Sequence, residues 1–160
     1  MLVLEAAKAV SNVETTLATI LSQMTELAKS LPEFSVVREM SGVGDVLAPR
    51  IIAEIGDVRR FHSASALIAY AGIDTPPYES GDFRANNRKI TKRGSASLRK
   101  TGYEIIQALK VVQPQSDNSV YQYLIKKESE GKPLKVAKIA ALNKFLRIYY
   151  ARVNEIYLNS

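Results

Sequence analysis

The sequence predicts an all-α protein, with a long N-terminal coiled-coil-like helix followed by a helical domain containing a helix-hairpin-helix. Three observations point to this class. Apolar residues recur at spacings of three and four, Gly and Pro separate these stretches, and no stretch alternates apolar and polar residues as a half-buried strand does. The 160 residues suffice for one domain and an appendage. We expect a coiled-coil helix over residues 1–31 and a helical domain over residues 32–160.

The first 31 residues carry an unbroken heptad repeat. Such a repeat forms the seam of a coiled coil, because a period of 3.5 residues keeps one stripe against a partner helix. The alternative is an amphipathic helix that lies on its own domain. We expect a homo-oligomer through this helix, since the repeat spans four heptads; its start in mid-pattern predicts a fragment of a longer chain. The apolar positions are Val3, Ala6, Val10, Val13, Leu17, Ile20, Met24, Leu27 and Leu31.

Two glycines stand between two short helical stretches after Pro32, which ends the first helix. The order of a helical stretch, Gly42-Val43-Gly44 and a second helical stretch predicts a helix-hairpin-helix over residues 36–56. The turn of such a motif presents backbone N–H groups at a helix N-terminus, where they bind a phosphate without reading sequence. The alternative is a corner between two helices that uses glycines only to turn.

Four more helices complete the predicted domain. The third of them starts near residue 118, and the last covers residues 134–158. In the helix that follows Ser95 we expect the buried face to extend to Val112. Serine and aspartate side chains accept a hydrogen bond from an unpaired amide at a helix start. The predicted N-caps are Ser63, Ser95 and either Ser116 or Asp117.

Basic residues concentrate in one segment. The formal charge is +6, and residues 81–100 hold seven basic residues and one acid, so the rest of the chain sums to zero. This imbalance indicates a docking surface for a polyanion; the alternative is a solvated loop. Six further basic residues between 131 and 153 form either a second contact or a solvated face. The predicted nucleic-acid contacts are Gly42, Val43, Gly44, Arg84, Arg88, Lys89, Lys92, Arg93 and Arg99.

Composition excludes several kinds of chemistry. The absence of Cys excludes disulfides and thiolate zinc sites, and a single His excludes a His-rich metal site. The acids show no grouping that would hold the cations of a metal-dependent phosphoryl transfer, so we expect no metal site in this chain. No apolar run approaches a membrane span, and the first residues show no basic region followed by an apolar core, so we do not expect secretion. We therefore expect a cytoplasmic protein without a membrane partner.

Residues 73–94 form a predicted basic loop with Ser80 in its middle. A hydroxyl on a cation-rich loop can attack a phosphodiester if arginines stabilise the transition state and a base takes the proton. From the residues alone, a solvated loop serine is the simpler interpretation.

Short motifs stand in a fixed order between residues 36 and 152. They are Gly42-Val43-Gly44 with Ala48, residues 53–57, Arg60-Phe61, residues 70–73, Ser80-Gly81, residues 90–94, Leu98-Arg99, residues 131–133, residues 137–144 and Tyr149. In this combination the sequence resembles a bacterial transposase family, the insertion-sequence group numbered one hundred and ten. It departs from the family at Ser95, where asparagine is expected, and in a loop diluted by Asp82, Asn86 and Asn87.

The resemblance implies an RNA-guided DNA recombinase whose C-terminal domain, present here, supplies Ser80 for strand cleavage and joining. It implies DNA and a guide RNA as partners, an oligomeric active form, and association with the nucleoid. A RuvC-like DEDD domain, absent from this chain, would supply carboxylates and magnesium. The isolated chain would then bind nucleic acid without cleaving it. The alternative is a non-catalytic module for nucleic-acid binding through the helix-hairpin-helix, or for oligomerisation.

Overall fold

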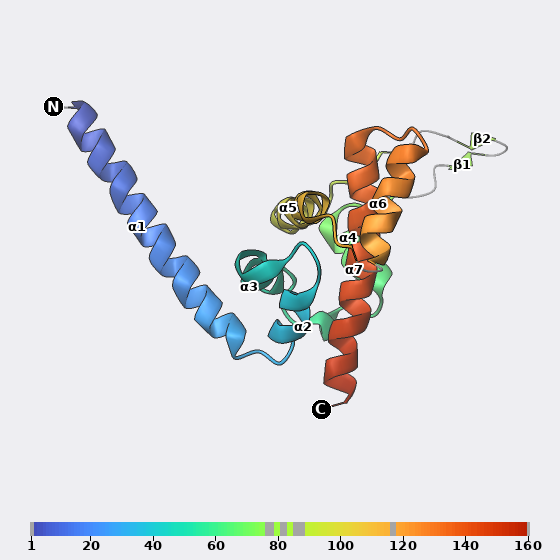
Figure 1. Cartoon of the computed structure of the whole chain (residues 1–160), viewed down its shortest axis with the longest axis horizontal. Helices are drawn as coiled ribbons and strands as arrows, with labels where there is room; N and C mark the ends of the chain where they lie inside the picture. The colour runs from blue at the N-terminus through green and yellow to red at the C-terminus, as the bar shows by residue number, and fades with distance from the viewer. Residues whose placement is uncertain (1, 76–78, 81–82, 85–88, 116–117, 160) are drawn as a thin grey trace.

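The computed structural model describes residues 2–75, 79–80, 83–84, 89–115 and 118–159, and within them it is helical (Figure 1). The all-α prediction is confirmed; a pair of two-residue antiparallel strands is the one addition in these residues. The elements are α1 (Leu2–Lys29), α2 (Phe34–Glu39), α3 (Gly44–Ile55), the 3₁₀ helix η1 (Val58–Arg60), α4 (Ala64–Ala71), β1 (Glu79–Ser80), β2 (Phe83–Arg84), α5 (Ala96–Val112), α6 (Ser119–Ser129) and α7 (Leu134–Leu158).

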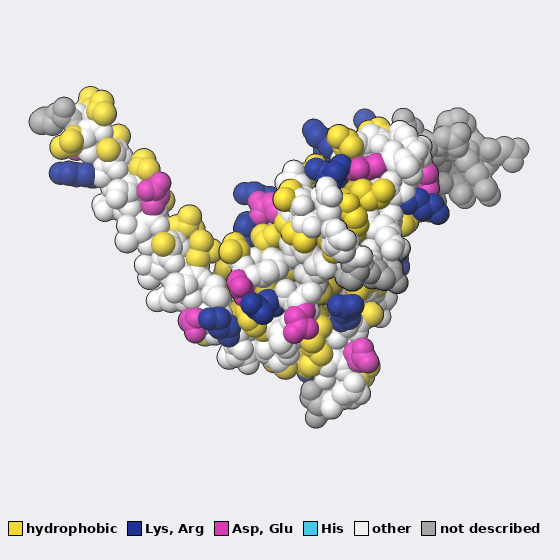
Figure 2. All heavy atoms as spheres, in the orientation of Figure 1, with side chains coloured by type: hydrophobic (Ala, Val, Ile, Leu, Met, Phe, Trp, Pro, Cys, Tyr) yellow, Lys and Arg dark blue, Asp and Glu magenta, His cyan; other side chains and the backbone are white. Residues whose placement is uncertain are grey.

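Helix α1 projects away from the other helices, and only its C-terminal end packs, against α2 and α3 (Figure 1). Ala28 is its one buried residue in the described chain. Figure 2 shows apolar side chains along the projecting part, and the heptad residues Leu17 and Ile20 are each 54% exposed. The chain's own domain therefore does not cover the heptad stripe, and pairing with another helix stays a prediction. No helix among the described residues is long and apolar enough to cross a membrane.

Helix α7 runs through the helical domain and packs against α2, η1, α4, α5 and α6. Its buried residues recur at spacings of three and four, so one broad face of the helix is covered on several sides. Small residues at 137 and 141 let neighbouring helices approach closely, and larger ones fill the space farther along. The buried residues of α7 are Ala137, Ala141, Leu142, Phe145, Leu146, Tyr149 and Val153.

The predicted helix starts are confirmed at two of three positions. The Ser63 hydroxyl accepts from Ala66 N at 3.2 Å, and Ser95 does the same for Leu98 N at 3.0 Å. The cap of α6 is Asn118, whose side chain accepts from two amides, and not Ser116 or Asp117, which lie outside the described residues. An amide oxygen one residue later satisfies the same unpaired N–H groups.

The prediction that the buried face of α5 reaches Val112 is wrong. Val112 is 63% exposed and Val111 is 82% exposed, whereas Leu109 is fully buried. The helix ends at this point in a left-handed C-cap at Gln113. Periodicity predicts which face of a helix is apolar, but it does not show where the covering helices stop.

Candidate nucleic-acid interface

Three backbone hydrogen bonds close the base of the basic loop. They join residues 70–74, which include the C-terminal end of α4, to residues 91–95, which precede α5. Because both sides are anchored to helices of the domain, the fold sets where the chain leaves for the loop and where it returns. The bonds run from Lys92 N to Gly72 O at 2.9 Å, from Thr91 N to Asp74 O at 3.0 Å, and from Ser95 N to Tyr70 O at 2.6 Å.

Two glycines allow the two sides of this base to touch. A Cβ at Gly94 would lie 1.9 Å from Tyr70 O, and one at Gly72 would lie 2.7 Å from Gly94 N. Thr91 Oγ1 also donates to Asp74 Oδ1 at 2.5 Å. The sequence pattern around Gly72 and Gly94 therefore has a structural reason: no other residue fits so tight a crossing.

Ser80 lies in β1, directly opposite Phe83 of β2, and Glu79 lies opposite Arg84. The side chains of these four residues are outside the described part of the structure, as is Arg88 altogether. The roles predicted for Ser80, Arg84 and Arg88 therefore remain predictions.

The other predicted cations of this segment are placed in two ways. Lys89, Lys92 and Arg93 are exposed, and Lys92 adopts a left-handed backbone conformation with φ of 56°. Arg99 instead donates from Nη1 to Ala71 O at 2.9 Å, where a cation is favourable because α4 ends there. The Arg99 guanidinium thus uses one of its N–H groups to join α5 to α4.

The residues of the glycine turn between α2 and α3 differ in their surroundings: some pack against the domain and one is open to solvent. Gly42, with φ of +86°, lies against α5, and a Cβ there would be 2.7 Å from Ile105 O. Val43 is 4% exposed, so its side chain belongs to the core. Gly44 has open space beside it and begins α3. Contact with nucleic acid through this turn stays a prediction, and in this geometry Gly44 is exposed whereas Gly42 is half-buried.

A carboxylate stands beside that turn. Asp45, in the first turn of α3, forms an ion pair with Arg38, and this hydrogen bond lowers the pKa of Asp45 below its usual value. The pair keeps Asp45 negatively charged next to Gly44, and a phosphate approaching the turn would have to compete with it for the Arg38 guanidinium.

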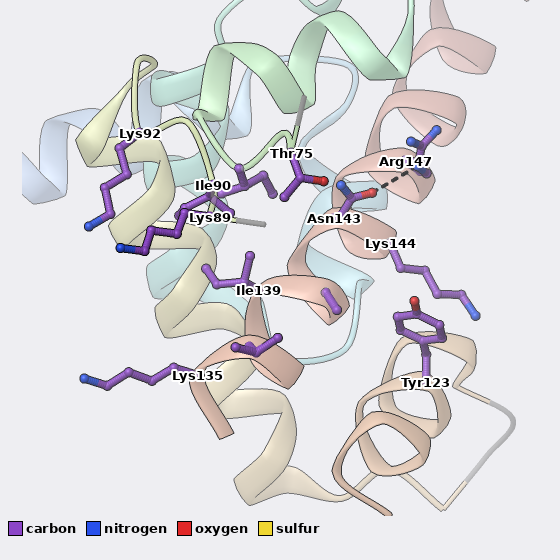
Figure 3. A pocket seen from close by; sticks show the side chains of 13 residues that line it. Thr75, Lys89, Ile90, Lys92, Tyr123, Lys135, Ile139, Asn143, Lys144 and Arg147 are labelled. Atoms are coloured by element: carbon purple, nitrogen blue, oxygen red, sulfur yellow. Dashed lines mark hydrogen bonds between the residues drawn. The ribbon is translucent and has the colours of Figure 1, made fainter. Parts of the chain in front are cut away.

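A groove of about 820 Å³ opens between the loop base, α6 and α7 (Figure 3). Its lining combines an apolar floor with a cationic rim, and none of the described residues that line it is acidic. We call this feature the α7 groove. The floor is formed by Ile73, Ile90, Val136, Ile139 and Ala140, and the rim by Lys89, Lys92, Lys135, Lys144 and Arg147.

The rim cations come from opposite sides of the α7 groove. Figure 3 shows Lys89 and Lys92 from the loop base on one side, and Lys144 and Arg147 on the other. None of the five rim residues forms an ion pair with a described residue. Arg147 Nε donates to Asn143 Oδ1 at 3.1 Å, and Lys144 Nζ lies 5.2 Å from the centre of the Tyr123 ring. These contacts hold the side chains in place, and no acidic side chain that the structure describes pairs with the rim cations.

The sequence predicted only part of this groove. Lys89 and Lys92 were predicted contacts, whereas Tyr123 and Asn143 were missed and the cations of α7 were left undecided. A usable signal was present: Val136, Ile139 and Asn143 share one helix face with two flanking cations, so an apolar stripe bordered by positive charge was visible in the spacing.

The described residues contain no group of three or more His, Cys, Asp or Glu side chains able to hold a metal ion. Asp57 pairs with Arg59 and Glu104 with Arg50, so these carboxylates serve as ion-pair partners rather than as a shared ligand set. The carboxylates that the structure describes therefore do not fit a catalytic magnesium site.

Residues 35–122, slightly more than half of the chain, match the model of the Transposase IS116/IS110/IS902 family. This chain belongs to that family. The match includes the glycine turn, the loop base and Ser80, and it ends before α7. The family predicted from the spaced motifs is confirmed, while the α7 side of the groove lies outside the matched region.

Two curated relatives are the proteins named "Pilin gene-inverting protein" from Moraxella bovis and Moraxella lacunata. Each is 26% identical to this transposase-family chain over 137 residues, which is 83% of the chain and 42% of the relative. The chain thus spans about two fifths of the length of these relatives.

Proposed function

We propose that this chain is the C-terminal, DNA-binding and strand-joining part of a transposase, and that Ser80 is its nucleophile. The observation that carries the proposal is the closed loop base. It places the two ends of the loop that contains Ser80, at Thr75 and Lys89, in the lining of a groove with five cations that no described acid neutralises. The family match, and the names of relatives that invert a gene segment, support the same class of activity.

In the proposed reaction, Ser80 Oγ attacks a DNA phosphorus and forms a phosphoserine ester. The bond from phosphorus to one DNA oxygen breaks, the Oγ proton passes to a base, and the departing oxygen takes up a proton. Negative charge grows on the phosphoryl oxygens in the transition state, and cations held nearby stabilise it. Arg84 and Arg88 are the predicted residues for this role, with Lys89 and Lys92 binding the flanking phosphates.

The carboxylates and magnesium of a RuvC-like DEDD domain would belong to a part of the protein outside these residues. The carboxylates among the described residues of this chain do not cluster into a ligand set for that metal. We expect the isolated chain to bind nucleic acid without cutting it.

The exposed heptad stripe of α1 supports assembly of two or more copies, which would bring several Ser80 loops together. We also propose that the glycine turn contacts nucleic acid as the turn of a helix-hairpin-helix. A guide RNA would be the second nucleic-acid partner. Gly42→Val does not test the turn, since the new side chain would clash with α5 whether or not DNA binds there.

The test uses the full-length parent protein with magnesium, guide RNA and labelled donor DNA. We expect a protein–DNA adduct that survives denaturation in the wild type and is lost in Ser80→Ala. Ser65→Ala is the matched control, because Ser65 is exposed on α4 and lies outside the loop; it should retain the adduct. An adduct in Ser80→Ala would show that another group is the nucleophile. Cleavage without any adduct would make this chain a binding module.

A further inference from the structure

We propose that the α7 groove binds an unpaired stretch of the DNA strand that reacts at Ser80, with a base on its apolar floor and phosphates on its rim. The inference rests on the proposed function, because it is that function which makes the strand at Ser80 a DNA strand. It adds a specific subsite, built largely from α7, and a specific state of the DNA.

The floor of the groove shows that the bound strand is unpaired. Val136 is 52% exposed and Ile139 and Ala140 are partly exposed, so apolar surface faces solvent between the cations. A duplex presents its phosphates outward and keeps its bases stacked in pairs, leaving nothing apolar to cover this floor. An unpaired strand can turn a base face onto an apolar surface while its phosphates contact cations.

The rim shows that the occupant is a polyanion and not an apolar peptide or helix. Lys89 and Lys92 on one side and Lys144 and Arg147 on the other place positive charge on both edges of the floor, and none of these cations is paired with a described acid (Figure 3). An apolar partner would have to cover these cations without pairing them, at a cost in desolvation. A strand that crosses the groove places a phosphate at each edge and a base between them.

The position of the groove assigns this strand to DNA. Thr75 and Lys89 line the groove, and they are the described residues that directly flank the loop segment containing Ser80. A strand in the α7 groove therefore passes next to both ends of the loop that carries the proposed nucleophile. Unpairing near the reacting phosphate would also give the strand freedom to change partners during recombination.

The first experiment measures binding of the 160-residue chain by fluorescence anisotropy. The probes are a single-stranded DNA, the RNA of the same sequence, the DNA duplex, and a strand in which abasic residues keep the phosphates but remove the bases. We expect the single-stranded DNA to bind about tenfold more tightly than the duplex or the abasic strand. Equal affinity for single strand and duplex, or a preference for RNA, would overturn the proposal while leaving nucleic-acid binding intact. No binding to any probe would overturn the proposed function as well.

Val136→Asp tests the floor directly. Val136 is exposed in the first turn of α7, where an acidic residue is favourable for the helix, so the change should not disturb folding. We expect it to weaken binding of single-stranded DNA about tenfold and to affect the duplex much less. Val111→Asp is the control: Val111 is 82% exposed on α5 and does not line the groove. An equal loss for both variants, or none for Val136→Asp, would contradict a base on the floor.

A measurement without substitutions gives an independent check. A single 2-aminopurine, moved position by position along the strand, fluoresces more strongly when its base leaves the stack. We expect one position, or two adjacent ones, to brighten on binding the wild-type chain, with quenching restored by excess unlabelled single strand. A uniform response along the strand would show that no base is singled out and would overturn the subsite.

Discussion

Helices α1 and α7 are similar in length and in pattern, with 28 and 25 residues and apolar residues at spacings of three and four. Their surroundings are opposite. In the described chain α1 buries only Ala28, whereas α7 buries seven residues and contacts most of the other helices. The same periodicity thus describes both a helix covered by its own chain and a helix whose apolar face is left for something else.

The connection at Pro32 contributes to this difference. Glu33, directly after it, is only 4% exposed and accepts a hydrogen bond from Tyr157 Oη at 2.6 Å, near the end of α7. Arg59 also lies over the Tyr157 ring at 4.5 Å. This cluster fixes the start of α2 against α7, and the preceding helix leaves in a direction that carries its stripe away from the core.

Removing a large side chain from α7 should give the largest effect. Phe145 is 1% exposed, and Phe145→Ala should lower the free energy of unfolding by about 3–5 kcal/mol, because it loses buried area and leaves a cavity. Leu17→Ala on α1 should change it by less than about 0.5 kcal/mol at low protein concentration, where any oligomer has dissociated. Urea denaturation followed by circular dichroism measures both. Similar values for the two variants would mean that α1 is packed in solution as α7 is.

Two tyrosines of α7 should respond in opposite directions when the hydroxyl is removed. Tyr157→Phe should lower the free energy of unfolding by about 2 kcal/mol, because the buried Glu33 carboxylate loses a donor. Tyr149 Oη is buried with no hydrogen-bond partner in the described structure. Tyr149→Phe should therefore raise the free energy of unfolding by about 1 kcal/mol. Destabilisation of equal size in both would show that Tyr149 Oη has a partner in solution.

The Tyr157 effect should depend on pH at the alkaline end. Burial and the hydrogen bond to Glu33 raise the pKa of Tyr157 from 10.0 to about 12. Since the folded pKa exceeds the unfolded one, this contribution is complete below about pH 10 and is lost as pH rises toward 12. The stability difference between wild type and Tyr157→Phe should therefore narrow across that interval. A constant difference would mean that the hydroxyl does not titrate in this way.

Much of the helical fold could be predicted from the sequence, because its helices carry their own start and stop signals. Ser63 and Ser95 cap as predicted, and Pro32 ends α1. What the sequence could not predict depends on neighbours far along the chain. The exposure of Val112 reflects where packing against α5 stops, and the capping of α6 by Asn118 was a choice among adjacent polar residues.

The sequence predicted where the positive charge of the candidate site lies, but it did not predict the groove that this charge borders. The cluster at residues 81–100 identified Lys89 and Lys92, but the α7 groove exists only because the loop base folds against α7, about fifty residues later in the chain. Gly42 shows that one residue type can have two explanations. A glycine in a turn suggested a ligand contact, which stays a prediction, and the close approach of α5 is a separate structural reason for the missing side chain.

The smallest expected effect on stability is the most informative about α1. Leu17→Asp places a charge at the centre of the heptad stripe but on a side chain already 54% exposed, so unfolding of the helical domain should hardly change. If α1 pairs with α1 of another copy, the same substitution should convert an oligomer to a monomer in sedimentation velocity, because a buried unpaired carboxylate is costly at a seam position.

Thr15→Asp is the matched control for Leu17→Asp, since it adds the same charge two residues away on the exposed side of the heptad. It should leave the oligomer intact. Loss of the oligomer in both variants would indicate that charge along α1 matters and the seam does not. A monomer in the wild type at all concentrations would show that the stripe of α1 awaits a different partner, and the contrast with α7 would then lie between a core within the chain and a surface for another molecule.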